Sequence, residues 1–198
     1  FLNGRGRLHR RMLLSRLTNL LDQSIWTNLD VTHGNELKLL DSKYEFDFYQ
    51  KNIMLDYSGF AKYKLFNNEW GEIYLNANPY LDTYFSLVTE TVFDYPYSFR
   101  TEKIWKPIAI GHPWIAVANR GFYRDMHNLG FKTFGDLVDE SFDQIDNSID
   151  RLERIAVVVE DLCQQDLAKF AKECYTVCKY NQQHLNELSL QIPKDFPA

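Results

Sequence analysis

The sequence predicts an α/β protein, with a parallel sheet in residues 1–140 and a long helical segment in residues 141–198. In the first part, apolar stretches of strand length alternate with helices of about ten residues, which is typical of parallel sheets. From Ser148 onward, apolar residues instead recur at helical spacing in two successive stripes. We expect these C-terminal helices to pack across the α/β part as an extension of it.

The first helix is expected over residues 8–22. Four leucines in that segment recur at the i, i+4, i+7 and i+8 positions of one helical face: Leu13, Leu17, Leu20 and Leu21. Residues 1–2 are the expected end of a preceding strand, and the loop between strand and helix contains two glycines. The order is therefore strand, glycine-containing loop and helix.

Further strands are predicted at four places along the chain. Residues 43–48 alternate strictly between aromatic and polar side chains, and another set begins at residues 72–76. Residues 84–89 and 114–118 are apolar stretches of strand length. Because helical patterns separate these stretches, we expect the strands to run parallel.

Helices are predicted over residues 101–111 and 122–129, each ended by a glycine. Pro107 lies inside the first of them and is expected to remove one backbone hydrogen bond and kink the helix. Residues 131–134 are expected to form a short extended piece. The C-terminal stripes form one long helix or two, interrupted near Gln164-Gln165.

Composition excludes several classes of protein. The chain has 198 residues, of which 45% are hydrophobic, which suffices for an ordinary core and excludes a disordered protein. Its net charge of -5 makes nucleic-acid binding an unfavourable interpretation. No apolar run approaches the roughly 18 to 20 residues of a membrane-spanning helix, so no membrane span is expected.

Cysteine usage indicates a reducing compartment. Cys163, Cys174 and Cys178 are an odd number in one late segment, which is no disulfide framework. We therefore expect a cytoplasmic protein, with association with a virion left open. Because the first residue is Phe1 and not Met, we expect a fragment, a processed product or an incompletely observed polypeptide.

Basic residues gather at the start of the first predicted helix. Five arginines and one histidine lie within sixteen residues: Arg5, Arg7, His9, Arg10, Arg11 and Arg16. Cations at a helix N-terminus oppose the helix dipole, so a bound anion would explain them. Arg10 falls within the leucine stripe and is expected to point toward the body of the protein. A solvated basic segment and a nucleic-acid-binding surface are the alternatives.

A second set of polar residues opens the helix predicted at 101–111. Thr101 is the expected N-cap, and Glu102 and Lys103 follow in the first turn. In open α/β sheets, ligands bind at the carboxyl ends of strands, where helices begin. A carboxylate there can hold ribose hydroxyls and an ammonium group can neutralise a diphosphate. Helix capping with a surface ion pair explains the same residues equally well.

A longer motif contains this second set. It runs Leu87-Val88-Thr89-Glu90, then Thr101-Glu102-Lys103-Ile104-Trp105, then Gly111-His112-Pro113-Trp114-Ile115. The motif, together with the first strand and helix, resembles the donor-binding domain of fucosyltransferase-like, inverting GT-B glycosyltransferases. The resemblance covers residues 1–21 and 82–134 and extends to short glycosyltransferase-like proteins of bacteria and tailed phages. It implies a Rossmann-like sheet, which is half of a GT-B architecture.

The resemblance also implies roles for individual residues. Glu102 would hold the donor ribose, Lys103 the diphosphate, and Arg10, or else Arg7, the second phosphate charge. The expected donor and phosphate site comprises Arg7, Arg10, Glu90, Thr101, Glu102 and Lys103. Thr91-Val92 departs from the Asn-Ser of that family. The family's catalytic base lies in an acceptor domain with no counterpart in this sequence, so the catalytic residues are unknown.

The expected function is therefore metal-independent transfer of a sugar from a nucleotide sugar to an acceptor hydroxyl, without a cofactor. Arg10 and Lys103 would stabilise the departing nucleoside diphosphate. The alternative is a non-catalytic structural or interaction protein that keeps a glycosyltransferase-like fold, with association with a phage left open. Its C-terminal helices would dock on a protein partner. The sequence leaves open whether the chain is an enzyme.

Other patterns have simpler explanations. Glu45 and Asp47 resemble the Asp-x-Asp metal site of GT-A glycosyltransferases, but strand alternation explains them equally well. Cys174 and Cys178 are expected to pack in the core rather than bind zinc. The acidic run at 136–150 is expected to be a solvated loop that leads into a negatively charged helix start.

Overall fold

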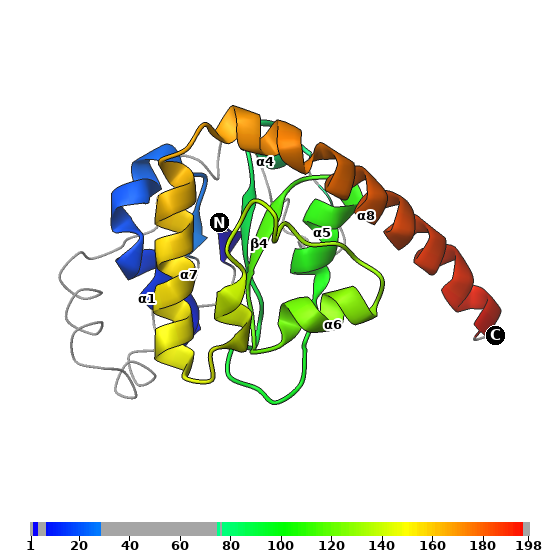
Figure 1. Ribbon diagram of the computed structural model, residues 1–198, viewed down its shortest axis with the longest axis horizontal. Helices are drawn as coiled ribbons and strands as arrows, with labels where there is room; N and C mark the ends of the chain where they lie inside the picture. The colour runs from blue at the N-terminus through cyan, green and yellow to red at the C-terminus, as the bar shows by residue number, and fades with distance from the viewer. Residues whose placement is uncertain (1, 4–6, 29–74, 76, 196–198) are drawn as a thin grey trace.

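The computed structural model describes residues 2–3, 7–28, 75 and 77–195. In this part of the chain, helices lie on both sides of short parallel strands (Figure 1). The strand predicted at 43–48, which contains Glu45 and Asp47, lies outside the described residues. The strand predicted at 72–76 also lies outside the described residues, apart from Leu75, which belongs to no strand.

The described strands form two parallel pairs. β1 (Leu2–Asn3) pairs with β2 (Thr27–Asn28), and β3 (Ser86–Thr89) pairs with β4 (Trp114–Val117). β1 also contacts β3, which brings the two pairs together. The second pair begins with Ser86 opposite Trp114 and ends with Thr89 opposite Val117. The prediction of a parallel α/β arrangement is confirmed, with strands of two to four residues in the described part.

Helices form a layer on each side of these strands. α1 (Leu8–Arg16) packs against α7 (Ser148–Cys163), and α5 (Glu102–Ile110) packs against α8 (Leu167–Asp195). Figure 1 shows α8 running over the strands from the α7 side to the α5 side and extending past the body. Residues beyond 140 thus contribute a helix to both layers.

Short helices complete the described structure. The α-helices are α4 (Asn78–Leu81), between β2 and β3 along the chain, and α6 (Phe122–Asn128), after β4. The 3₁₀ helices are η1 (Thr18–Gln23), after α1, and η3 (Ser141–Gln144), before α7. Within the described residues, no helix combines the length and the apolar character needed to cross a membrane.

One core joins the strands to both helix layers. Every residue of β4 is buried, as its continuous apolar sequence predicts for a strand covered on both faces. The largest fully buried apolar side chains come from α1, α5, β4, α6, η3 and α7: Leu13, Leu14, Ile104, Ile108, Trp114, Ile115, Phe122, Met126, Phe142 and Ile155. Cys174 and Cys178 of α8 are buried in the same core as free thiols, as predicted.

The first helix is shorter than predicted. α1 starts at Leu8, as expected, but ends at Arg16, and η1 follows it up to Gln23. The Oγ1 of Thr18 donates hydrogen bonds to the carbonyl oxygens of Leu14 (3.2 Å) and Ser15 (2.7 Å). A threonine hydroxyl that bonds the preceding turn competes with the regular helical ladder, which favours the tighter 3₁₀ geometry.

The α5 prediction is confirmed at both ends. The helix begins after Thr101, whose Oγ1 accepts a hydrogen bond from the Lys103 N–H, and ends at Gly111. Gly111 has a φ of 71°, a left-handed conformation that glycine adopts without steric cost. Pro107 lies within the helix, which continues for three more residues to Ile110.

The C-terminal region forms two helices, and the break lies at Gln164-Gln165 as one of the alternatives predicted. The extended piece predicted at 131–134 forms no strand. In this extended piece, Asn181 of α8 accepts a hydrogen bond from the Lys132 N–H and donates one to the Lys132 carbonyl oxygen, both at 2.8 Å. These backbone groups are therefore bonded to α8 and cannot pair with a strand.

The expectation of a solvated acidic loop at 136–150 is wrong for two residues. Asp143 is buried and accepts hydrogen bonds from the N–H groups of Tyr123 (3.1 Å) and Arg124 (3.3 Å) in the first turn of α6. Glu140 accepts from the Thr133 hydroxyl (2.7 Å) and the Phe134 N–H (2.8 Å). These carboxylates satisfy backbone donors that would otherwise lack partners.

Candidate functional site

The first turn of α1 reaches the carboxyl end of β3. The Nη2 of Arg10 donates hydrogen bonds to the carbonyl oxygens of Thr89 (3.0 Å) and Glu90 (3.2 Å). Arg10 is only 2% exposed, so the prediction that it points toward the body is confirmed. The α1 N-terminus has neither a capping side-chain hydrogen bond nor an acidic residue in its first turn. The side chain of Arg10 therefore joins the start of α1 to the end of β3.

Glu90 links the same strand end to the start of α5. Its side chain is fully buried. Its Oε1 accepts the Thr101 N–H (3.1 Å), and its Oε2 accepts the Thr101 hydroxyl (2.6 Å) and the Thr91 N–H (3.3 Å). A buried carboxylate with three donors is well compensated. The carboxylate of Glu90 therefore serves to hold the α5 N-cap in place.

Glu102 and Lys103 form an ion pair with each other at the start of α5. The Lys103 Nζ lies 2.5 Å from the Glu102 Oε1 and also donates to the Thr101 Oγ1 (3.4 Å). The two charged side chains are 29% and 25% exposed. Helix capping and an ion pair are therefore both present, as one interpretation of this segment predicted. The exposure leaves both groups within reach of a ligand.

The six predicted site residues thus gather around one point, which we call the β3-end cluster: Arg7, Arg10, Glu90, Thr101, Glu102 and Lys103. Burial and the charge of Arg7 lower the pKa of Arg10 to about 10, whereas Glu90 and Glu102 act in the opposite direction. Burial alone would raise the pKa of Glu102, but its hydrogen bond and attraction to Lys103 lower the pKa overall. These electrostatic interactions connect the first turns of α1 and α5.

The members of the cluster differ in their access to solvent. Arg10 and Glu90 are buried, whereas Arg7, Glu102 and Lys103 are half-buried. Arg10 already donates to two carbonyl oxygens. A ligand arriving from solvent would therefore meet Arg7 and Lys103 directly, and Arg10 would act on it mainly through its charge.

His9, one of the basic residues at the start of the first predicted helix, lies beside the cluster. Its Nε2 lies 2.9 Å from the Glu90 carbonyl oxygen, and its ring stacks on Phe93 with centroids 5.3 Å apart. Burial and then the charge of Arg10 lower the pKa of His9 to about 3, so the ring is neutral at pH 7. A hydrogen bond across 81 residues has no local sequence signal.

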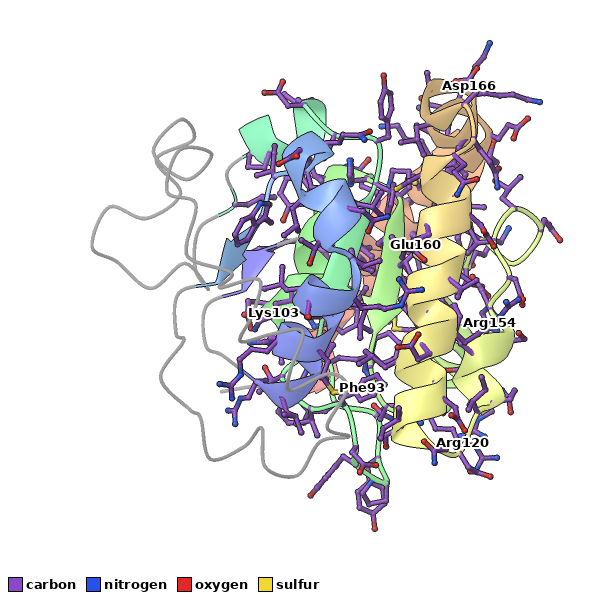
Figure 2. The ribbon with its side chains drawn as sticks, turned by 90° about the vertical axis from the view of Figure 1, so that its left-hand side faces the viewer. Phe93, Lys103, Arg120, Arg154, Glu160 and Asp166 are labelled. Carbon is purple, nitrogen blue, oxygen red and sulfur yellow. The ribbon has the colours of Figure 1, made fainter. Side chains whose placement is uncertain are left out.

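Arg151 of α7 fixes the chain just after β3. Its Nη2 donates to the Phe93 carbonyl oxygen (2.9 Å), and its guanidinium lies 4.4 Å from the centre of the Phe93 ring. Its Nη1 donates to the Ile145 carbonyl oxygen (2.8 Å). In Figure 2, Phe93 lies in the lower part of the view, whereas Asp166 lies at its top. The C-terminal segment therefore helps to shape the surroundings of the cluster.

A separate groove of about 440 Å³ lies between η1 and the end of α7. It is lined by Asn19, Leu20, Gln23, Glu160, Asp161, Cys163 and Gln164. Both oxygens of Glu160 accept from Arg16, at 2.8 and 2.9 Å. The lining of the groove contains Glu160 and Asp161 and no Lys or Arg, so the groove suits neither phosphate nor a nucleoside diphosphate.

No family model, no curated protein and no solved structure matches this chain. The similarity to fucosyltransferase-like proteins therefore stays a prediction. Among the described residues, no three His, Cys, Asp or Glu side chains are grouped so as to hold a metal ion.

Proposed function

We propose that the α/β part binds a nucleotide sugar and serves metal-independent transfer of its sugar to an acceptor hydroxyl, as the Rossmann-like donor half of a GT-B architecture. The observation that carries this proposal is the meeting of the first turns of α1 and α5 at the end of β3. This is the edge of a parallel sheet at which ligands bind. There, the charge of Arg10 interacts with those of Arg7, Glu90 and Glu102, and Lys103 pairs with Glu102.

Binding would rearrange one interaction of the cluster. A diphosphate oxygen would replace the Glu102 carboxylate as the partner of the Lys103 ammonium group. The Glu102 carboxylate would then accept hydrogen bonds from the ribose hydroxyls. Arg7 would contact the second phosphate, and the buried Arg10 would add positive potential in a setting of low dielectric.

The reaction would be a displacement at the sugar. The acceptor hydroxyl oxygen forms a bond to the anomeric carbon, and the bond from that carbon to the diphosphate oxygen breaks. The electron pair leaves with the nucleoside diphosphate, and the hydroxyl proton passes to a general base that stays unassigned. Stabilisation of the departing charge by cationic side chains replaces the divalent ion that many phosphate-transfer sites use.

Nucleotide-dependent stabilisation tests the proposal. The melting temperature of the full chain is measured with a panel of nucleoside diphosphates and nucleotide sugars. A ligand at about 100 times its Kd stabilises the folded state by about 2.7 kcal/mol, which is a shift of about 5 to 10 °C for a chain of this size. Lys103→Ala and Glu102→Gln should each abolish the shift.

Lys169→Ala is the matched control, because Lys169 is an exposed helical lysine 3.8 Å from a glutamate, Glu173. The control should retain the full nucleotide-dependent shift. If no nucleotide raises the melting temperature, or if Lys169→Ala abolishes the shift as Lys103→Ala does, the proposed donor site is wrong.

The second candidate is a non-catalytic interaction protein that docks through α8. The observation in its favour is apolar surface on this helix, where Tyr175 is 61% and Leu190 is 63% exposed, together with its extension past the body (Figure 1). Size-exclusion chromatography with light scattering separates the two functions. A stable assembly without a nucleotide response supports this candidate, and a nucleotide-responsive monomer contradicts it.

A further inference from the structure

The loop between β3 and α5 presents three aromatic rings to solvent. Tyr95 is 52% exposed, Tyr97 is 72% exposed and Phe99 is 44% exposed. Single exposed apolar residues are common on protein surfaces, but three rings at alternate positions of one loop form a patch. Helix capping and core packing explain none of these exposed rings.

The first end of this loop is fixed in the protein. Phe93 is buried between the ring of His9 and the guanidinium of Arg151. The Phe93 carbonyl oxygen accepts a hydrogen bond from Arg151, and the Glu90 carbonyl oxygen accepts hydrogen bonds from Arg10. The chain therefore leaves the β3-end cluster from a held position.

The second end of the loop is fixed on α6 and on the connection that leads from β4 to it. The Ser98 hydroxyl donates to the Asp125 carboxylate, and the Phe99 N–H donates to the Asn119 Oδ1 (3.4 Å). Between the two ends, Tyr95 and Tyr97 contact each other edge to face, with ring centroids 5.9 Å apart. The loop is thus held at both ends and its two tyrosine rings contact each other, which reduces the entropy cost of ordering them on a ligand.

The patch lies beside the candidate donor site. Phe99 precedes the α5 N-cap Thr101 by two residues, which is at most about 7 Å along the chain. Figure 1 shows the loop projecting from the edge of the molecule at which β3 and β4 end. A group that extends from a sugar held at this edge would meet the rings first.

The size and chemistry of the patch favour a carbohydrate. With about 200 Å² per aromatic side chain, the three rings expose about 300 Å², whereas a stable protein interface buries about 800 Å² on each partner. A membrane-binding loop typically carries an excess of Lys or Arg beside its rings, whereas in this loop the exposed Asp94 offsets the charge of the half-buried Arg100. The C–H face of a sugar ring packs on the negative face of an aromatic ring, and its hydroxyls bond tyrosine hydroxyls and carboxylates.

We propose that Tyr95, Tyr97 and Phe99 form a carbohydrate-binding platform that holds the acceptor glycan beside the β3-end cluster. Only the identification of the bound glycan as the acceptor rests on the proposed glycosyl transfer. The platform itself is built from the fixed, exposed rings and binds oligosaccharides with or without a nucleotide.

Direct binding of oligosaccharides tests the platform. The full chain is mixed with oligosaccharides of glucose, galactose, mannose or N-acetylglucosamine, and contacts are detected by saturation-transfer NMR and quantified on a biosensor. Tyr97→Ala and the double variant Tyr95→Ala/Tyr97→Ala should weaken the best-bound sugar by about tenfold or more. Tyr175→Ala, which removes an equally exposed tyrosine from α8, should leave the affinity unchanged. The melting temperatures should all match the unmodified chain, because exposed rings contribute little to the core.

The results separate this inference from the proposed function. Sugar binding that the loop variants abolish supports the platform, and a nucleotide-dependent shift that the same variants retain supports the donor site independently. Absence of binding to every sugar in the panel, or equal binding by the loop variants, overturns the platform even where nucleotides stabilise the chain. Loop-dependent binding to anionic lipid vesicles in place of sugars also overturns it.

Discussion

Removal of the Glu90 carboxylate should loosen the junction between β3 and α5. Glu90 is fully buried, and its oxygens accept three hydrogen bonds, two of them from Thr101. Glu90→Ala leaves the Thr101 N–H and hydroxyl without this partner and removes a negative charge near Arg10. Glu90→Gln keeps the size of the side chain and one carbonyl oxygen, but its NH₂ group cannot accept a hydrogen bond from the Thr101 hydroxyl.

The expected size of the effect follows from the number of bonds. Hydrogen bonds to a charged acceptor contribute about 1.5 to 3 kcal/mol each. Because Thr91 and Thr101 are half-buried, water can replace part of each bond, and the lower value applies. For the two shorter bonds from Thr101, Glu90→Ala should therefore lower the free energy of unfolding by about 3 kcal/mol, and Glu90→Gln by about half of that. The larger loss corresponds to a fall in melting temperature of about 6 to 12 °C.

Urea denaturation followed by circular dichroism measures both losses, and thermal melts provide the second readout. Glu173→Ala is the control, because Glu173 is an exposed glutamate whose ion pair with Lys169 contributes at most about 1 kcal/mol. If Glu90→Ala is no less stable than Glu173→Ala, the carboxylate does not hold the α5 N-cap. The structural role assigned to Glu90 would then be refuted.

Three further predictions concern other buried polar groups. The pKa of His9 is lowered to about 3 in the folded protein and is 6.5 in the unfolded chain, so the unfolded state binds more protons between these values. The stability that neutral His9 contributes is complete above pH 6.5 and is lost as the pH falls toward 3. Urea titrations at pH 7, 6 and 5 give the free energy of unfolding at each pH. This free energy should fall with decreasing pH more steeply in the unmodified chain than in His9→Phe, by up to about 1.4 kcal/mol per pH unit. Equal slopes in the two proteins would contradict the assignment. Asp143→Ala should lower the free energy of unfolding by about 2 kcal/mol, because the α6 N–H groups lose their acceptor, and hydrogen exchange at Tyr123 and Arg124 should accelerate. Asn181→Ala should cost about 2 kcal/mol by freeing the Lys132 backbone, and an unchanged urea midpoint would contradict this.

Local sequence signals predicted most of the elements that the structure describes. Apolar stretches located β3 and β4, and a threonine cap with a terminal glycine located α5 to within a residue. These signals are local, because capping and hydrophobic periodicity act within a few residues. The end of α1 was predicted wrongly because the leucine stripe continues through η1, where the Thr18 hydroxyl changes the backbone pairing.

Contacts between distant residues had no such signal. The buried Asp143 and the half-buried Glu140 accept hydrogen bonds from backbone donors 6 to 20 residues away, so the sequence alone made this acidic run resemble an exposed loop. The same holds for Asn181, which bonds Lys132 across 49 residues. A polar residue in a sequence does not reveal whether its partner is water or a backbone group, and only the fold decides between them.

For the candidate site, the sequence by itself supplied the residue types: cations at the start of α1 and a Thr-Glu-Lys turn at the start of α5. Only the tertiary structure decided what each of them contacts. Parallel strands place the helix starts at one edge, and burial there turned Arg10 and Glu90 inward to backbone groups while Lys103 and Glu102 stayed accessible. The physical reason is that a charged group is buried only where partners from distant segments compensate for its lost hydration, and those partners come together only when the chain folds.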